Sequence, residues 1–125
     1  MPCRYVIDKP RRLIISIYSD HVTLAEIEGH KDQFTSDPEF DPEFDQFVDL
    51  TAVTALDISI DEAKTIARRK VFSPTARRAF LASSPSVYGM YRLMEAYHSM
   101  AEGEEQVCVF YDREAALKWL GVHSV

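Results

Sequence analysis

The sequence predicts an α/β fold with the element order β-β-α-β-α-β-α-β-α, in which four helices cover a mostly parallel five-stranded sheet. Two observations lead to this prediction. Apolar runs of strand length alternate along the chain with segments that have helical spacing. Residues that cap the first turn of a helix follow several of these runs. Strands that alternate with helices form parallel sheets with right-handed crossovers.

The first part of the chain predicts an antiparallel hairpin followed by a helix. Residues 5–7 and 13–18 are strand-like, and the Asp-Lys-Pro-Arg turn at 8–11 joins them. Thr23, with Glu26 three residues later, forms a capping box. We therefore expect an amphipathic helix to begin directly after Thr23.

The segment after this helix, SDPEFDPEFD, contains a tandem Asp-Pro-Glu-Phe at 37–40 and 41–44. Each proline excludes a regular helix or a central strand at its position. Five acidic side chains could gather calcium, but the EF-hand pattern with its central glycine is missing. We expect a solvated acidic loop and no metal site.

The middle of the chain predicts two more strands with a helix between them. The third strand covers 46–54, the second helix 60–71 and the fourth strand 78–82. Ser-Pro pairs on both sides of the fourth strand mark its limits.

The third helix begins with Ser84 as its N-cap and Pro85 as its first residue. We expect it to run to about Ala101 and to end near Gly103. Several large side chains recur along it at helical spacing, and we expect them to face the core rather than to form a cofactor site. These residues are Val87, Met90 or Tyr91, Met94, and Tyr97 or His98.

The chain closes with a fifth strand and a fourth helix. Residues 106–111 form a continuous apolar run, as a strand covered on both faces should. Asp112 caps a helix over 113–120, and Gly121 ends it. No linker or composition break divides the chain, so we expect a single domain over residues 1–125.

Composition is that of an ordinary globular protein, with 46% hydrophobic and 27% charged residues. The N-terminus carries too many charges for a secretory signal, and no apolar run approaches the roughly 20 residues of a spanning helix. The net charge of −6 argues against nucleic-acid binding. Cys3 and Cys108 lack any metal or redox spacing, so we expect both to be core residues. These observations favour a cytoplasmic protein without stable membrane insertion.

Charge is distributed unevenly along the chain. Residues 20–62 hold thirteen acids and one base, whereas residues 63–94 hold seven bases and no acid. Such polarity could support head-to-tail association or a charged partner. We favour two solvated surfaces that neutralise each other across the fold.

The element order and two short motifs resemble the STAS domains of anti-sigma-factor antagonists. Asp49-Leu50-Thr51 matches the Asp-Leu-Ser/Thr of their third strand, and Asp57-Ile58-Ser59 matches the Asp-Ser-Ser-Gly that follows, except that Ile60 replaces the glycine. The chain also resembles the SpoIIAA-like group of bacterial STAS/SEC14-type proteins. That resemblance includes PSVYGMYR at 85–92 and ALKWL at 116–120. It implies a STAS/SpoIIAA-like fold over nearly the whole chain.

Ser59, with Asp57, is one candidate site. The resemblance implies that a serine at this position is phosphorylated by a partner kinase and switches binding. A phosphate would be stabilised at a helix N-terminus. Glu62, however, stands three residues after Ser59, and a capping box alone explains the serine. We favour the capping role.

The other candidate is a ligand- or partner-binding patch of Pro85, Ser86, Tyr88, Gly89 and Arg92. A glycine one turn into a helix is costly unless something approaches closely. The C-terminal ends of strands are also where open α/β sheets bind ligands. The alternative is that Gly89 admits a neighbouring helix and Arg92 pairs with the acidic part of the chain.

No enzyme motif is present: the chain lacks GxSxG, HExxH, P-loop and GxGxxG patterns, and its four histidines have no ligand-like spacing. We expect a non-enzymatic regulatory module, without cofactor, that binds a protein partner or a second copy of itself. The alternative is a carrier or sensor of an apolar small molecule or lipid, by analogy with SEC14-type folds. A carrier needs an internal cavity lined by residues such as Phe72, Phe80, Met90 and Met94.

Overall fold

The computed structural model describes residues 2–100 and 106–125, and its centre is a five-stranded sheet with strands in sequence order. The first two strands are antiparallel and all later neighbours are parallel. The strands are β1 (Cys3–Asp8), β2 (Leu13–Thr23), β3 (Asp45–Asp57), β4 (Arg77–Leu81) and β5 (Gln106–Phe110). The predicted fold class is confirmed.

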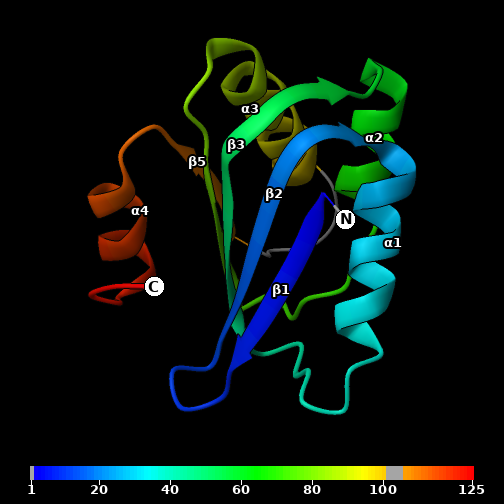
Figure 1. Cartoon of the computed structure of the whole chain (residues 1–125). Helices are drawn as coiled ribbons and strands as arrows, with labels where there is room; N and C mark the ends of the chain where they lie inside the picture. Colours follow the sequence, from blue (N-terminus) through cyan, green and yellow to red (C-terminus); the bar gives the residue numbers. More distant parts are fainter. Residues whose placement is uncertain (1, 101–105) are drawn as a thin grey trace.

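Four helices cover the sheet unequally (Figure 1). They are α1 (Leu24–Thr35), α2 (Ile60–Arg68), α3 (Pro85–Met100) and α4 (Arg113–Leu120). The first three pack on one face, and α4 alone packs on the other, against β4 and β5. The predicted end of the third helix near Gly103 lies outside the described residues.

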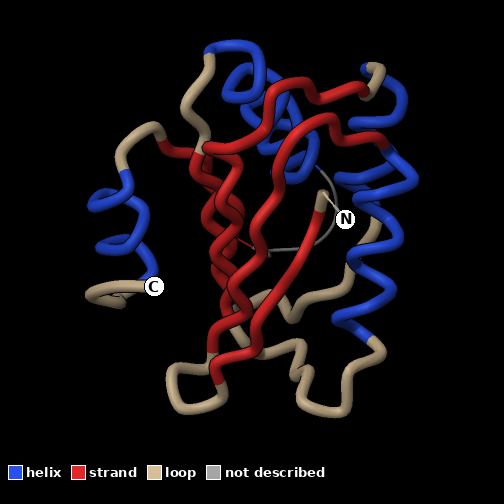
Figure 2. The backbone as a smooth tube through the Cα atoms, in the orientation of Figure 1, coloured by secondary structure: helices blue, strands red, loops and turns tan. Residues whose placement is uncertain are grey.

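The strands β2 and β3 are longer than the sequence predicts, because they continue side by side past the other strands (Figure 2). Their pairing runs to Thr23 and Asp57, with register shifts after Ile17 and after Asp20. Asp20 has a φ of 60°, which bends the strand there. The apolar alternation in the sequence stops at this bend. For that reason the sequence predicts a strand that ends at Tyr18, whereas β2 continues to Thr23.

The capping boxes predicted for α1 and α2 are both present. Thr23 accepts a hydrogen bond from the Glu26 amide while the Glu26 carboxylate accepts one from Thr23. The helix α2 ends at Arg68, three residues earlier than predicted, because Arg69 adopts an extended conformation. The Arg69 guanidinium binds two carboxylates of α1, Glu28 at 2.8 Å and Asp32 at 2.6 Å. Arg69 thus joins the basic part of the chain to the acidic part.

The acidic loop between α1 and β3 consists of two similar turns. Asp37 and Asp41 each accept a hydrogen bond, at 2.9 Å, from the amide two residues later. The backbone oxygens of the same aspartates bind the amides of Phe40 and Phe44 at 3.0 Å. Both phenylalanines pack into the core. Because each Asp forms a turn and each Phe anchors it, the repeat has a structural explanation.

The core-facing stripe predicted for the third helix is confirmed at four positions. Val87, Tyr91, Met94 and His98 are all buried beneath α3. The first three belong to the main core cluster between the sheet and the three helices.

Candidate functional site

Ser59 is exposed and caps α2, as expected. Its Oγ accepts a hydrogen bond from the Glu62 amide at 3.1 Å, and the Ser59 amide donates to the Glu62 carboxylate at 2.8 Å. Asp57 ends β3, where its carboxylate lies 3.1 Å from the His21 Nε2. The cap accounts for the serine. A phosphoacceptor role for Ser59 stays a prediction, and an intact-mass measurement on protein from its native host would detect the phosphate.

The patch at the start of α3 combines a capped helix end with an aromatic pair. Pro85 is the first helical residue, and the Ser84 Oγ accepts a hydrogen bond from the Val87 amide at 3.4 Å. The ring of Tyr88 stacks on Tyr111, with centroids 3.9 Å apart and planes 10° from parallel. Tyr111 directly follows β5 and is 53% exposed.

The alternative in which Gly89 admits a neighbouring helix is wrong. A Cβ at this position would meet no atom within 4 Å, so no neighbouring helix requires a glycine there. Arg92 pairs with Glu95 on its own helix at 3.1 Å, and this contradicts the alternative in which it pairs with the acidic part of the chain. Ser86 lies beside Ser84 at the exposed helix start. A role for this patch in binding stays a prediction.

Arg92 lines an open hollow of about 320 Å³ with residues of α3 and β5, but the sheet topology predicts no ligand crevice at the start of α3. Open α/β sheets bind ligands where the strand order reverses and helices depart to opposite faces. Here the order never reverses along β2 to β5, and all three crossover helices lie on the same face. The topology therefore predicts no ligand crevice at the carboxyl ends of these strands.

The structure instead reveals a row of buried polar residues that crosses the sheet beneath α1. His30 on α1 lies 2.8 Å from the Ser16 Oγ on β2. The Gln46 side chain on β3 donates to the same Oγ at 2.9 Å and accepts from the Arg78 Nε on β4 at 3.0 Å. All four residues are buried. This row ties α1 and three strands together in one arrangement.

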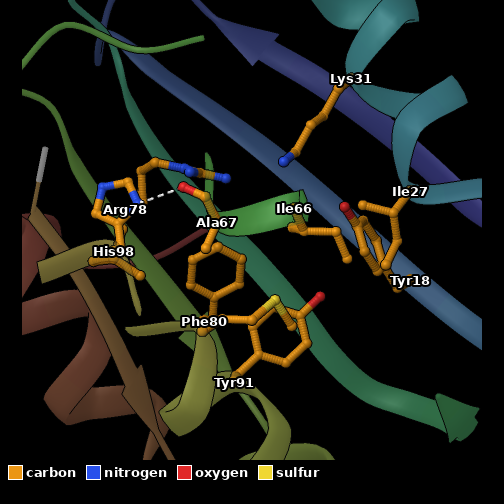
Figure 3. Close-up of a pocket in the computed structure, with 11 residues that line it drawn as sticks. Tyr18, Ile27, Lys31, Ile66, Ala67, Arg78, Phe80, Tyr91 and His98 are labelled. Carbon is orange, nitrogen blue, oxygen red and sulfur yellow. Dashed lines mark hydrogen bonds between the residues drawn. The ribbon is translucent and has the colours of Figure 1, made fainter. Parts of the chain in front are cut away.

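A small cavity of about 30 Å³ lies next to this row (Figure 3). Its lining is mixed, with apolar side chains beside two cations, a histidine and two tyrosines. The residues are Tyr18, Ile27, Lys31, Ile66, Ala67, Arg78, Phe80, Tyr91, Met94, His98 and Val107. A site that holds one water needs about 10–15 Å³, so this cavity accommodates a water or two.

Burial controls the ionisation of the two tyrosines that line the cavity and of His30. It raises the pKa values of Tyr18 and Tyr91 far enough that both phenols stay protonated. Burial, together with the charge of Lys31, lowers the pKa of His30 to about 4. His30 is therefore neutral at physiological pH. The His98 Nδ1 lies 3.3 Å from the Ala67 carbonyl on α2, so His98 links α3 to α2.

No pattern in the sequence identifies this row of buried polar residues in advance. Ser16 and Gln46 interrupt apolar strands, but a polar residue in a strand usually marks a solvated face.

The described residues contain no group of three or more His, Cys, Asp or Glu side chains placed to hold a metal ion. The cysteines have free thiols, with Cys3 in β1 and Cys108 in β5. Burial raises the pKa of Cys3 to about 11, so its thiol is a poor nucleophile. Among the helices of the described ranges, none has both the length and the apolar character needed to cross a membrane.

No protein-family model and no curated protein matches the chain. Among solved structures, the chain is similar to the crystal structure of an uncharacterized protein of the DUF3478 family, with a SpoIIAA-like fold, from Shewanella loihica PV-4. The TM-score is 0.61 and the identity 16%, over 94% of this chain and 93% of the other. The protein described above therefore has a SpoIIAA-like fold.

Proposed function

We propose that this protein is a non-enzymatic regulatory module of the bacterial cytoplasm that acts by binding a partner protein. The proposed docking surface is the carboxyl edge of the sheet around Tyr88 and Tyr111. The stacked tyrosine pair, with one ring half exposed, is the observation that carries this proposal. The free cysteine thiols fit a reducing compartment.

An exposed tyrosine stacked on another ring is well suited to protein recognition. Tyrosine is enriched among the residues that contribute most to binding energy at interfaces. Stacking holds the Tyr111 ring before a partner arrives, which lowers the entropy lost on binding. Two residues after Tyr111, Arg113 binds Asp49 at 2.9 Å, and this ion pair supports a polar rim for the proposed interface.

The size of the internal cavity supports a binding role at the surface over a carrier role. Pockets for small molecules have volumes of about 300–1,000 Å³, roughly ten times that of the cavity beside Tyr91. Phe80 and Met94 line this cavity, as a carrier requires, but Phe72 and Met90 do not. The same small size argues against catalysis inside this cavity, because a substrate has no room there.

The test replaces Tyr111 with serine and uses Ile60→Ser as a matched control, because Ile60 is 57% exposed at the start of α2. Proteins captured from a lysate of the native host identify a partner, and the purified partner is then titrated against each variant by calorimetry. We expect Tyr111→Ser to weaken binding by at least about tenfold, as the loss of an interface tyrosine usually does. Ile60→Ser should bind as the unaltered protein does. Equal affinity of all three proteins, or a loss only with Ile60→Ser, would refute this docking surface.

A further inference from the structure

Within residues 2–100 and 106–125, β1 is an edge strand, and no other strand of these ranges pairs with its outer backbone groups. The Ser19 amide donates to the Pro2 carbonyl at 2.7 Å, and Cys3 lies opposite Tyr18 in the register. In an antiparallel ladder, this register points the backbone amide and carbonyl of every second residue toward β2, beginning at Pro2. The amides and carbonyls of Cys3, Tyr5 and Ile7 therefore point away from the sheet. Figure 1 looks toward this edge, where β1 is the strand nearest the viewer.

The side chains of β1 that face the α4 side of the sheet lie on an uncovered surface. Tyr5 and Ile7 pack into the core under α1, so Arg4, Val6 and Asp8 project from the opposite face. The helix α4 packs on β4 and β5 and does not reach this far. Val6 is 60% exposed at the centre of the edge. Edge strands of monomeric proteins usually carry a lysine, a proline or a bulge at such a position.

We propose that β1 pairs with β1 of a second copy of this chain, antiparallel and with Val6 opposite Val6. This is the register that joins the outward backbone groups of Tyr5 to those of Ile7 in the other copy. It also places Arg4 of each copy directly opposite Asp8 of the other. Opposite charges at facing positions stabilise an antiparallel pair. Two five-stranded sheets become one sheet of ten strands.

The alternation of charge makes this edge complementary to itself. Along one face of β1 a basic, an apolar and an acidic residue follow one another, namely Arg4, Val6 and Asp8. A two-fold axis through Val6 therefore brings the basic residue of each copy opposite the acidic residue of the other. Asp8 also accepts hydrogen bonds from Arg11 in its own chain. A carboxylate has enough lone pairs to accept from Arg4 of the other copy as well.

A hollow beside the edge is placed to receive the turn of the second copy. It has a volume of about 230 Å³ and is lined by five residues of α1 and by the start of β1. Its lining residues are Pro2, Cys3, Ala25, Glu26, Gly29, His30 and Gln33. The proposed register puts Lys9 of the other copy beside Cys3, and Pro10 beside Pro2. The basic turn thus meets a hollow lined partly by Glu26, whose carboxylate caps α1.

Sedimentation of purified protein tests this interface. The unaltered chain should sediment at twice its mass of 14.3 kDa. Val6→Lys should sediment as a single chain, because the two lysines would face each other across the axis. Ile60→Lys, at a similarly exposed apolar residue, should remain a dimer.

Cross-linking tests the register. In a chain with Cys3→Ala and Cys108→Ala, Val6→Cys should form an intermolecular disulfide on mild oxidation. Facing residues of a non-hydrogen-bonded antiparallel pair have Cα atoms about 4.5 Å apart, within the range of disulfides. An unaltered protein that sediments as one chain, a dimer that persists in Val6→Lys, or a dimer that fails to cross-link at Val6→Cys would overturn the proposal. The docking surface at Tyr111 follows the opposite edge strand, β5, so the two proposals can fail separately.

Discussion

Replacing Phe34 with alanine is expected to lower the free energy of unfolding by about 3–5 kcal/mol, the usual cost of deleting a buried phenylalanine ring. Phe34 lies on α1, is fully buried, and packs against aromatic rings from four other positions. Its ring contacts are Tyr5, His30, Phe40 and Phe72, with centroids between 5.3 and 6.1 Å. These rings come from β1, α1, the acidic loop and the segment after α2. One substitution therefore loosens four parts of the fold.

Urea unfolding followed by circular dichroism measures this loss as a shift of the midpoint at constant slope. Ile60→Ala is the control, because this exposed residue should change stability by no more than about 0.5 kcal/mol. A loss of less than about 1 kcal/mol for Phe34→Ala would show that this aromatic cluster is not packed as described.

Acid should destabilise the protein through His30. Its pKa is about 4 in the folded state, against 6.5 for an unburied histidine. Between these values the unfolded chain binds a proton that the folded protein does not, so stability is complete above about pH 6.5 and falls as the pH approaches 4. The difference corresponds to about 3 kcal/mol lost over this window. The neighbouring Tyr5 and Tyr18 have raised pKa values and do not titrate there.

The variant His30→Gln isolates this contribution from those of the carboxylates. A glutamine can still hydrogen-bond to Ser16 but has no proton to gain. Free energies of unfolding for both proteins should be measured by urea titration at several values between about pH 7 and pH 4. We expect the unaltered protein to lose about 3 kcal/mol more than His30→Gln over this range. Parallel pH curves for the two proteins would mean that His30 is accessible to solvent or already charged.

Local patterns predicted the fold well because capping and strand signals here are short-range. Thr23 and Ser59 each begin a helix where their glutamate partner stands three residues later. The helix α4 has the predicted bounds, since Asp112 and Gly121 mark both of its ends. The errors arise where tertiary contacts override the pattern. The helix α2 ends before Arg69, whose side chain binds Glu28 on α1. These two residues lie far apart in the sequence, so a local pattern cannot reveal their contact.

The site was harder to predict, because burial depends on which elements cover which face. Ser16 and Gln46 look like solvent-facing residues of a strand, yet α1 covers that face, and His30 and Arg78 complete their hydrogen bonds. At Gly89 the sequence left a neighbouring helix open as an explanation, and the structure contradicts that alternative. The exposed stacking of Tyr88 on Tyr111 joins residues far apart in the chain. Single-sequence reasoning has no means to detect such a pair.

Native mass spectrometry of protein purified gently from its own host tests most directly whether this protein works through its surface and not through a stored ligand. The cavity of about 30 Å³ leaves no room for an acyl chain. We expect masses of the polypeptide, alone or in multiples, with no lipid or other apolar molecule bound to it. Release of a lipid or fatty acid in a fixed ratio to the chain would contradict a surface role and identify the protein as a carrier.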